Sequence, residues 1–404
     1  MWDNLPTEIW SDILHRLGVK PLIRCTILSK SFLSLITSHH FISTHIAKHA
    51  NPHLLLRYFT VDSKKKKKKY HEMYHFEPDN DTFSGFQSKG LLLPFLNYPA
   101  DKCFTVAGCV NGVLCLVNDF RIEGTLIILW NPSIRKFVHV PQPNIVYDES
   151  YGSYESVCGF GFDSISNDYK VVRIVKLDET TLPTQVEVFS LKSRCWRVIG
   201  DGPSYLIKRH HCGYTPCFSN GSVYWIGYRL VGPNKNVILK FDLSTESFEI
   251  IQLPRILIEN ESAGVMDLYV QEYKGNLSLI KRNYDDEITS CTAWIMMEDG
   301  VVKSWSKMFD FDIGKSGMPR AFGFRKNGEI MMVKGGQNIY SGNRNDQNVV
   351  VSTDLVSHGV TALRGIKGIS VDRFSFYLST YVESMVLFKE GIGIKKQTTQ
   401  LALF

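Results

Sequence analysis

One short stretch of the chain has the residue types of a zinc protease. His71, Glu72 and His75 fit the H-E-x-x-H pattern, in which both histidines bind zinc and the glutamate activates water. That chemistry requires a helix, because a rise of about 1.5 Å per residue brings side chains four positions apart onto one metal. Six lysines precede this stretch and Pro78 follows it, so we expect a strand. A strand would hold the histidines roughly 13 Å apart, too far to share zinc.

The other groups of reactive residue types also fit no established site pattern. Gly314-Lys315-Ser316 resembles the end of a phosphate-binding loop, but Phe309 stands where that loop needs glycine. Asp285-Asp286-Glu287 is most simply a solvated turn. The remaining candidates have no standard zinc-finger spacing and are expected to be strand residues: His210, His211, Cys212 and Cys217. The sequence therefore predicts no catalytic residue, no metal site and no cofactor.

The charge of the chain argues against a nucleic-acid-binding surface. The net charge is +6, and the run Lys64 to Lys69 supplies six positive charges, so the rest sums to about zero. Adjacent lysines repel one another, which favours a loop between two strands.

The chain has no apolar run near the roughly 18 residues that span a bilayer, and no signal-peptide pattern. We therefore expect a location in the cytoplasm, the nucleus or both, without membrane contact. The nine cysteines are scattered, and in a reducing compartment they are expected to be buried thiols.

Apolar residues recur at helical spacing at the start of the chain. After Leu5-Pro6, a proline suited to a first helical turn, the pattern Ile9, Ile13, Leu14, Leu17 predicts an amphipathic helix that Gly18 ends. A second helix is predicted to begin at Pro21 and carry Leu22, Ile23, Ile27 and Leu28. A third is predicted from about Lys30 to Ser38.

Three short helices in about forty residues bury too little surface to be stable alone. A partner surface would supply what is missing. The alternative is that these helices simply cap the larger domain.

This module resembles an F-box, the helical motif that docks on a Skp-type adaptor of cullin ubiquitin ligases. The resemblance covers residues 4 to 46, from Leu5-Pro6-x-Glu8-Ile9 through Phe41-Ile42-x-x-His45, and departs from the family pattern at Gly18, Pro21 and Leu28 to Phe32. It implies that adaptor contacts come from Leu5, Pro6, Ile9, Ile13, Leu14, Leu17, Leu22 and Ile23.

Turn dipeptides recur at regular intervals from about residue 100. Asn111-Gly112, Asn167-Asp168, Asn220-Gly221, Gly275-Asn276 and Asn327-Gly328 start 56, 53, 55 and 52 residues apart. Asn and Gly tolerate the positive φ of tight hairpins, so each dipeptide indicates a hairpin. A second mark accompanies the first, because two aromatic residues flank a six-residue polar turn: Trp130 and Phe137, Phe189 and Trp196, Phe241 and Phe248.

These marks indicate about four strands in some fifty residues, which is typical of a kelch-like β-propeller blade. Segments 54–60 and 70–76 are predicted to pair with the terminal segment 381–390 and close the ring. Five marked units and a closing one predict six blades, with five or seven as alternatives. A twisted β-sandwich is the other interpretation. The fold class is therefore mainly β, with a three-helix module at 1–48 and a propeller at 49–404.

The larger region is similar to the F-box-associated domain of plant F-box proteins. The segments that carry this resemblance are CVNGVLCL (109–116), LWNPSIRKF (129–137), GFGFDSISNDYKVVRI (159–174) and VEVFSLKSRCWRVI (186–199). The ending TYVESMVLFKE resembles that of the S-locus F-box group, which implies a secreted ribonuclease as one possible target.

Both resemblances imply a substrate-recognition subunit of a Skp-cullin-F-box ubiquitin ligase. The helices would bind the adaptor and, through it, cullin, while the propeller would hold a target protein for ubiquitination and degradation. Such a subunit needs no catalytic residue, because it acts by proximity. The alternatives are a propeller that binds proteins outside the ubiquitin pathway and, least favoured, a zinc hydrolase using His71, Glu72 and His75. The lysine run is a candidate nuclear-import signal or ubiquitin acceptor.

Overall fold

The computed structural model describes most of the chain. The described residues are 6–49, 52–62, 69–80, 82–83, 85–86, 90–91, 93, 104–120, 124–146, 154–177, 183–207, 216–229, 236–259, 267–284, 289–299, 302–314, 320–334, 349–354, 360–362, 377–389 and 392–393. Leu5, the lysines 64–68, His210 to Cys212, Asp285 to Glu287 and Lys315-Ser316 lie outside them.

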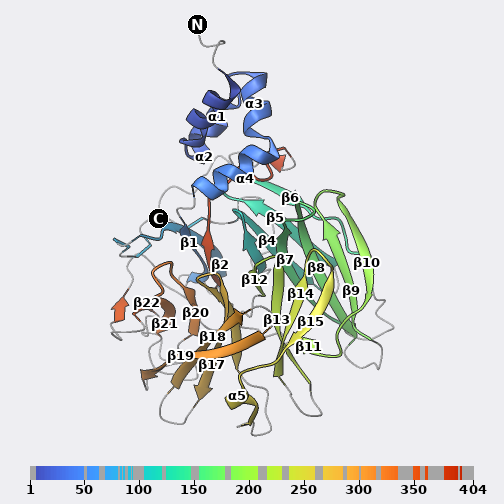
Figure 1. Ribbon diagram of the computed structural model, residues 1–404, viewed down its shortest axis with the longest axis vertical. Coiled ribbons are helices and arrows are strands. Elements are labelled where there is room, and N and C mark those ends of the chain that lie inside the picture. Colours follow the sequence, from blue (N-terminus) through green and yellow to red (C-terminus); the bar gives the residue numbers. More distant parts are fainter. Residues whose placement is uncertain are drawn as a thin grey trace.

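The amino-terminal residues form a helical module at one end of the molecule (Figure 1). Its helices are α1 (Thr7–His15), α2 (Val19–Cys25), α3 (Lys30–Ile36) and α4 (His39–Lys48). Three helices were predicted, and α4 is an addition. Its start is set by Ser38, whose hydroxyl accepts a hydrogen bond from the Phe41 amide at 3.2 Å. α2 also begins earlier than predicted, with Pro21 inside its first turn.

The rest of the described chain forms six antiparallel sheets, which confirms the predicted six-bladed propeller. Blade 1 contains β3 (Thr105–Val110), β4 (Val113–Phe120), β5 (Gly124–Asn131), β6 (Lys136–His139) and β25 (Ile392–Gly393). Blade 2 contains β7 (Tyr154–Asp163), β8 (Asp168–Leu177), β9 (Gln185–Ser190) and β10 (Cys195–Asp201). Blade 3 contains β11 (Leu206–Ile207), β12 (Cys217–Ser219), β13 (Ser222–Tyr228), β14 (Asn236–Asp242) and β15 (Ser247–Ile251).

The second half of the ring follows the same order. Blade 4 contains β16 (Leu268–Tyr273), β17 (Asn276–Tyr284), β18 (Thr289–Asp299) and β19 (Val302–Gly314), and the helix α5 (Arg255–Glu259) precedes it. Blade 5 contains β20 (Arg320–Phe324), β21 (Ile330–Lys334), β22 (Val349–Thr353) and β23 (Val360–Ala362). Blade 6 contains β24 (Tyr377–Tyr381), β1 (His53–Asp62) and β2 (Lys69–Pro78).

Blade 6 closes the ring with strands from both ends of the chain. β1 pairs with β2 on one side and with β24 on the other, which confirms the predicted role of the two early segments. The prediction for the terminal segment was largely wrong, because only Tyr381 of residues 381–390 belongs to β24. Among the described residues, one further bridge extends this blade, in which Leu91 and Tyr74 exchange backbone hydrogen bonds. Blade 6 therefore joins the two ends of the chain in one sheet and completes the ring.

A hairpin lies at each predicted dipeptide, but not every turn has two residues. The turn at Asn167 comprises residues 164–167, because Asp168 already belongs to β8, and the turn at Asn327-Gly328 comprises residues 325–329. Positive φ values occur at Asn111 and Gly112 and at Asn220 and Gly221, as two-residue hairpins of this hand require. The third such turn lies one residue earlier than predicted, at Lys274-Gly275, because Asn276 already belongs to β17.

The aromatic marks also take the predicted positions. Trp130 is paired with Phe137, Phe189 with Trp196 and Phe241 with Phe248 as direct cross-strand neighbours. The rings are 5.6 Å apart in the second pair and 4.8 Å in the third, a separation at which aromatic edges and faces attract.

Each polar turn between these aromatics is held by the last residue of the first strand. The side chains of Asn131, Ser190 and Asp242 accept hydrogen bonds from backbone amides inside the turn. The residue before the second strand's start has positive φ in all three turns, at Arg135, Arg194 and Glu246. The repeated sequence pattern is therefore a repeated turn structure.

The two faces of the ring differ. Turns joining first to second strands and third to fourth strands, such as Asn111-Gly112 and 132–135, lie on the face that carries the helical module. The connections between blades lie on the opposite face, where α5 is visible at the foot of Figure 1. These connections vary in length: residues 315–319 join β19 to β20, whereas residues 202–216 join β10 to β12 and include the short strand β11.

Neighbouring blades are joined by polar contacts to these connections. The Trp196 indole donates to the Pro141 carbonyl at 2.8 Å, and the Trp305 indole donates to the Gln252 carbonyl at 2.9 Å. In both cases an outer strand fixes the segment that arrives from the preceding blade. A buried pair in blade 2, Arg173 and Glu187 at 2.7 Å, binds the same kind of segment, because Glu187 accepts from the Ile145 amide.

Candidate functional site

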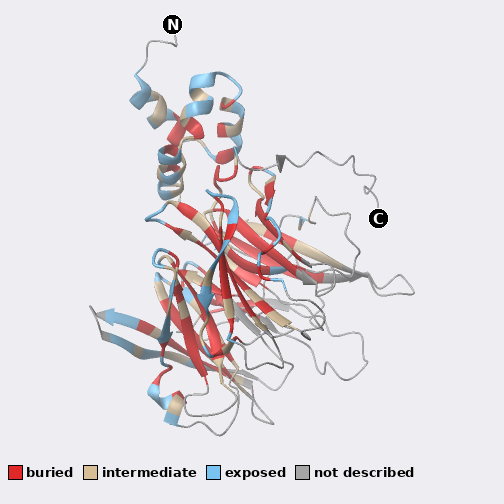
Figure 2. Ribbon diagram, turned by 90° about the vertical axis from the view of Figure 1, so that its right-hand side faces the viewer, coloured by how far each residue is buried: buried red, intermediate tan, exposed pale blue. Residues whose placement is uncertain are grey.

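The helical module exposes large apolar side chains although it has a buried core of its own. The exposed fractions are 48% for Ile9 and 43% for Ile13 on α1, 83% for Ile27 and 69% for Leu28 in the turn after α2, and 38% for Leu33 on α3. Figure 2 shows the exposed residues of the module (pale blue) around buried ones (red). Exposed apolar groups of this size are typical of a surface that binds another protein.

The predicted adaptor-contact residues divide between this surface and the core. Leu14 and Leu22 are buried, at 2% and 0% exposure, while Leu17 and Ile23 are half-buried against the core. Pro6, Ile9 and Ile13 are exposed, and Leu5 lies outside the described residues. The predicted contact residues therefore lie partly in the core of the module and partly on its surface.

Ile27, Leu28 and Leu33 were not among the predicted contact residues. Ile27 and Leu28 lie in the turn between α2 and α3, directly before Ser29, whose hydroxyl accepts from the Phe32 amide at 3.0 Å. An apolar pair before a helix-capping serine is a signal that helical periodicity does not detect. The rings of Trp10 and Phe32 lie 5.0 Å apart and join α1 to α3. The exposed side chains of α1 and those of the α2–α3 region therefore belong to helices that pack against each other.

A column of aromatic rings holds α4 against α1. His15 stacks on Phe41 with centroids 4.0 Å apart, and His45 stacks on His49 at 4.3 Å. His45 Nε2 lies 2.8 Å from the Leu17 carbonyl. Burial lowers the pKa of His45, and burial together with the nearby Lys48 ammonium lowers the pKa of His15, so the neutral rings are favoured.

The H-E-x-x-H stretch lies in β2, as expected from its flanks. Glu72 forms an ion pair with Arg57 at 2.7 Å and accepts from the Tyr74 hydroxyl at 2.7 Å. His75 is buried, with Nε2 3.0 Å from the Tyr58 hydroxyl. Glu72 is therefore engaged in the structure of blade 6, on the face of the strand opposite both histidines.

Of the remaining candidate residues, the structure describes Cys217 and Gly314. Cys217 is buried in β12, and burial raises the pKa of its thiol, which keeps it protonated. Gly314 is the last residue of β19. Across the part of the chain that the structure describes, no three His, Cys, Asp or Glu residues are grouped to hold a metal ion.

Family models match both parts of the chain. The F-box domain matches residues 2–44, and the F-box associated beta propeller domain matches residues 58–355. The chain belongs to the F-box proteins that carry an F-box-associated β-propeller. The helical module is therefore its F-box, and five exposed or half-buried residues of the predicted contact set lie within it: Pro6, Ile9, Ile13, Leu17 and Ile23.

Curated relatives of this F-box protein come from Arabidopsis thaliana. F-box protein CPR1 is 30% identical over 337 residues, covering 78% of this chain and 74% of the relative. F-box protein At4g22390 is 29% identical over 336 residues, covering 75% and 73%. Among solved structures, the fungal lectin from Aleuria aurantia, a six-bladed propeller, covers 78% of this chain and 96% of its own with 10% identity and a TM-score of 0.40.

In the described part of this F-box protein, no helix has the length and apolar character needed to cross a bilayer.

Proposed function

We propose that this protein is the substrate-recognition subunit of a Skp-cullin-F-box ubiquitin ligase. The observation that carries the proposal is the exposed apolar surface of the F-box, formed by Ile9, Ile13, Ile27, Leu28 and Leu33. Burying an isoleucine side chain on a partner contributes about 1.5–3 kcal/mol, and a few such residues carry most of the binding energy in a typical interface. In this proposal residues 1–48 bind the Skp-type adaptor, which links the chain to cullin, and residues 49–404 bind the target protein.

The proposed role needs no catalytic side chain. A target held on the propeller places its lysines near a ubiquitin-loaded conjugating enzyme elsewhere in the assembly, and the rate increases through local concentration.

We infer that the target binds the face opposite the F-box, because the turns on the near face are short. The proposal includes action in the cytoplasm, the nucleus or both. The secreted-ribonuclease target and the S-locus similarity stay predictions.

Co-purification with a Skp-type adaptor tests the proposal. We expect the full-length wild type to retain the adaptor and the double variant Ile9→Asp/Ile13→Asp to lose it, because each carboxylate would have to be desolvated in an apolar interface. Both positions are exposed, so the folded chain should tolerate the changes. The matched control is Ile165→Asp, at an 82% exposed isoleucine in the β7–β8 turn.

A wild-type chain that retains no adaptor would contradict the ligase assignment. It would favour the alternative, a propeller that binds proteins outside the ubiquitin pathway. Equal retention by the wild type and the double variant would leave the ligase assignment in place and show that α1 is not the docking surface.

A further inference from the structure

The segment after β24 leaves the sheet and is buried without forming a strand. Ser384, Met385 and Leu387 are 0%, 1% and 1% exposed, and Val386 is 8% exposed. Leu387 has φ 69°, a conformation that costs a bulky side chain free energy. Such a conformation persists only where surrounding contacts stabilise it. Residues 382–389 must therefore be held by contacts with other parts of the chain.

Two turns of blade 1 supply the polar contacts. The Asn131 amide donates to the Ser384 carbonyl at 3.1 Å, to the Ser384 hydroxyl at 3.2 Å and to the Val386 carbonyl at 2.8 Å. The Ser384 hydroxyl donates to the Asn111 carbonyl at 2.6 Å. Asn131 is fully buried, so these bonds are shielded from water.

The glycine of the first turn is required by the same contact. A Cβ at Gly112 would lie 2.4 Å from the Val382 carbonyl oxygen and 2.7 Å from the Ser384 hydroxyl. In the equivalent turn of blade 3, a Cβ at Gly221 would have no atom within 4 Å, although φ is nearly the same, +73° against +77°. Gly112 therefore has a role in seating the segment that Gly221 does not share.

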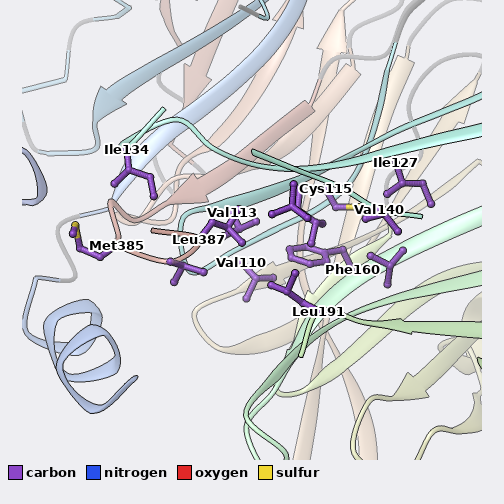
Figure 3. Close-up of a cluster of buried hydrophobic side chains, with 14 of the residues drawn as sticks. Val110, Val113, Cys115, Ile127, Ile134, Val140, Phe160, Leu191, Met385 and Leu387 are labelled. Atoms are coloured by element: carbon purple, nitrogen blue, oxygen red, sulfur yellow. The ribbon is translucent and has the colours of Figure 1, made fainter. Parts of the chain in front are cut away.

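Apolar contacts connect the segment to both domains. Met385, Val386 and Leu387 belong to one buried cluster together with F-box residues, including Leu14, Leu22 and Phe41, and blade 1 residues, including Val113 and Ile134. Figure 3 shows Met385 and Leu387 beside Ile134 and Val113, with a helix of the F-box beyond Met385. Glu383 also acts electrostatically on His45 of α4.

At the other end of the segment, the Lys136 ammonium bonds the Phe388 carbonyl and lies 4.4 Å from the centre of the Phe388 ring. β25 then pairs with β6 of the same blade. The segment is thus fastened to blade 1 along its whole described length while its apolar side chains reach the F-box.

We propose that residues 382–389 are a clamp that fixes the orientation of the F-box on the propeller. The covalent connection between α4 and β1 is only residues 49–52, which alone would let the F-box rotate. With the clamp seated, an adaptor on the F-box and a target on the far face keep a constant separation. This consequence for ubiquitin transfer rests on the function proposed above, whereas the clamp itself does not.

Two variants unseat the clamp by different means. Gly112→Ala places a methyl group against Val382 and Ser384, and its control is Gly221→Ala, which strains an equivalent turn but meets no atom. Asn131→Asp keeps the turn acceptor and removes the amide donor, because an ionised carboxylate only accepts hydrogen bonds. Blade 3 has Asp242 at the corresponding position, so the turn tolerates aspartate, and Asp242→Asn is the reciprocal control.

Hydrogen exchange and small-angle X-ray scattering on the full-length chain measure the effect. We expect amides of 382–389 to exchange about tenfold faster in Gly112→Ala and Asn131→Asp than in the wild type and both controls, since local opening becomes easier. The maximum dimension from scattering should increase in the same two variants. Should Gly112→Ala fail to fold, Asn131→Asp decides.

Exchange in 382–389 equal to that of the controls would overturn the proposal, and so would faster exchange with an unchanged scattering profile. Adaptor binding is measured separately and should be retained by both clamp variants. A wild-type chain that binds no adaptor would remove the proposed function while leaving these two measurements fully interpretable.

Discussion

At the residue scale, an aromatic pair and a polar turn residue recur in several blades, because each blade must pack against its neighbours and reverse the chain in a tight turn. Two sheets can stack only if large apolar groups fill the space between them, and the aromatic pairs do this at the outer hairpins. The polar residue between the aromatics holds the turn. Burial would raise the pKa of Asp242, but hydrogen bonds from Ser244 and Thr245 lower it to about 2, so the charged form caps the turn.

The aromatic pairs predict unequal effects of truncation. Phe241 is fully buried and Phe248 is half-buried. We expect Phe241→Ala to lower the free energy of unfolding by about 3–5 kcal/mol, because the cavity is enclosed, and Phe248→Ala to lower it clearly less. Urea denaturation followed by tryptophan fluorescence measures both. Equal losses would contradict the proposed packing of this hairpin.

At the element scale, the strands were easier to predict than their ends. Hairpin positions follow from local chemistry, since Asn111-Gly112 and Asn220-Gly221 require no knowledge of the fold. The clamp was predicted as part of a closing strand, although its apolar run Met385 to Phe388 follows directly after β24 without forming one. Distant partners, among them Asn131 and Asn111, hold it outside the sheet, and no local pattern encodes a contact across more than 250 residues of chain.

The candidate site was predicted in part for a similar reason. Helical periodicity identifies the apolar stripe of α1, but it does not say which side of the stripe the module uses for its own core. Packing against α4 decides this, and α4 itself was not predicted. Leu14 is therefore buried while its near neighbour Ile13 is exposed.

The histidine column predicts that the F-box loses stability in acid. The pKa values of His15 and His45 are lowered in the folded state, so the unfolded chain binds more protons. The stabilisation is complete above the unfolded pKa of about 6.5 and decreases as pH falls below it. We expect helix-specific circular dichroism to show easier urea unfolding at pH 5.5 than at pH 7.5.

A replacement that cannot titrate should reduce this dependence. His15→Phe keeps a ring stacked on Phe41 and removes the proton-binding nitrogens, whereas His40→Gln removes an exposed histidine as the control. The interpretation fails if His15→Phe unfolds with the same pH dependence as the wild type while His40→Gln also matches it.

At the scale of the whole molecule, the F-box and the far face of the propeller lie at opposite ends (Figure 1). Strands from both ends of the chain close the propeller in blade 6. This closure fixes the positions of the blades whose connections form the far face. The F-box stands on the near face, where short turns and the clamp hold it. This arrangement separates the proposed adaptor surface from the proposed target surface by the full depth of the propeller (Figure 1).

The central claim is that the exposed apolar side chains of the F-box bind a Skp-type adaptor. Isothermal titration calorimetry with the full-length chain tests it through two isoleucines of matched exposure, Ile27 at 83% and Ile165 at 82%. We predict saturable 1:1 binding by the wild type and by Ile165→Asp, and an affinity at least tenfold weaker for Ile27→Asp, which corresponds to about 1.4 kcal/mol. No binding by the wild type, or equal weakening by both variants, would contradict the claim.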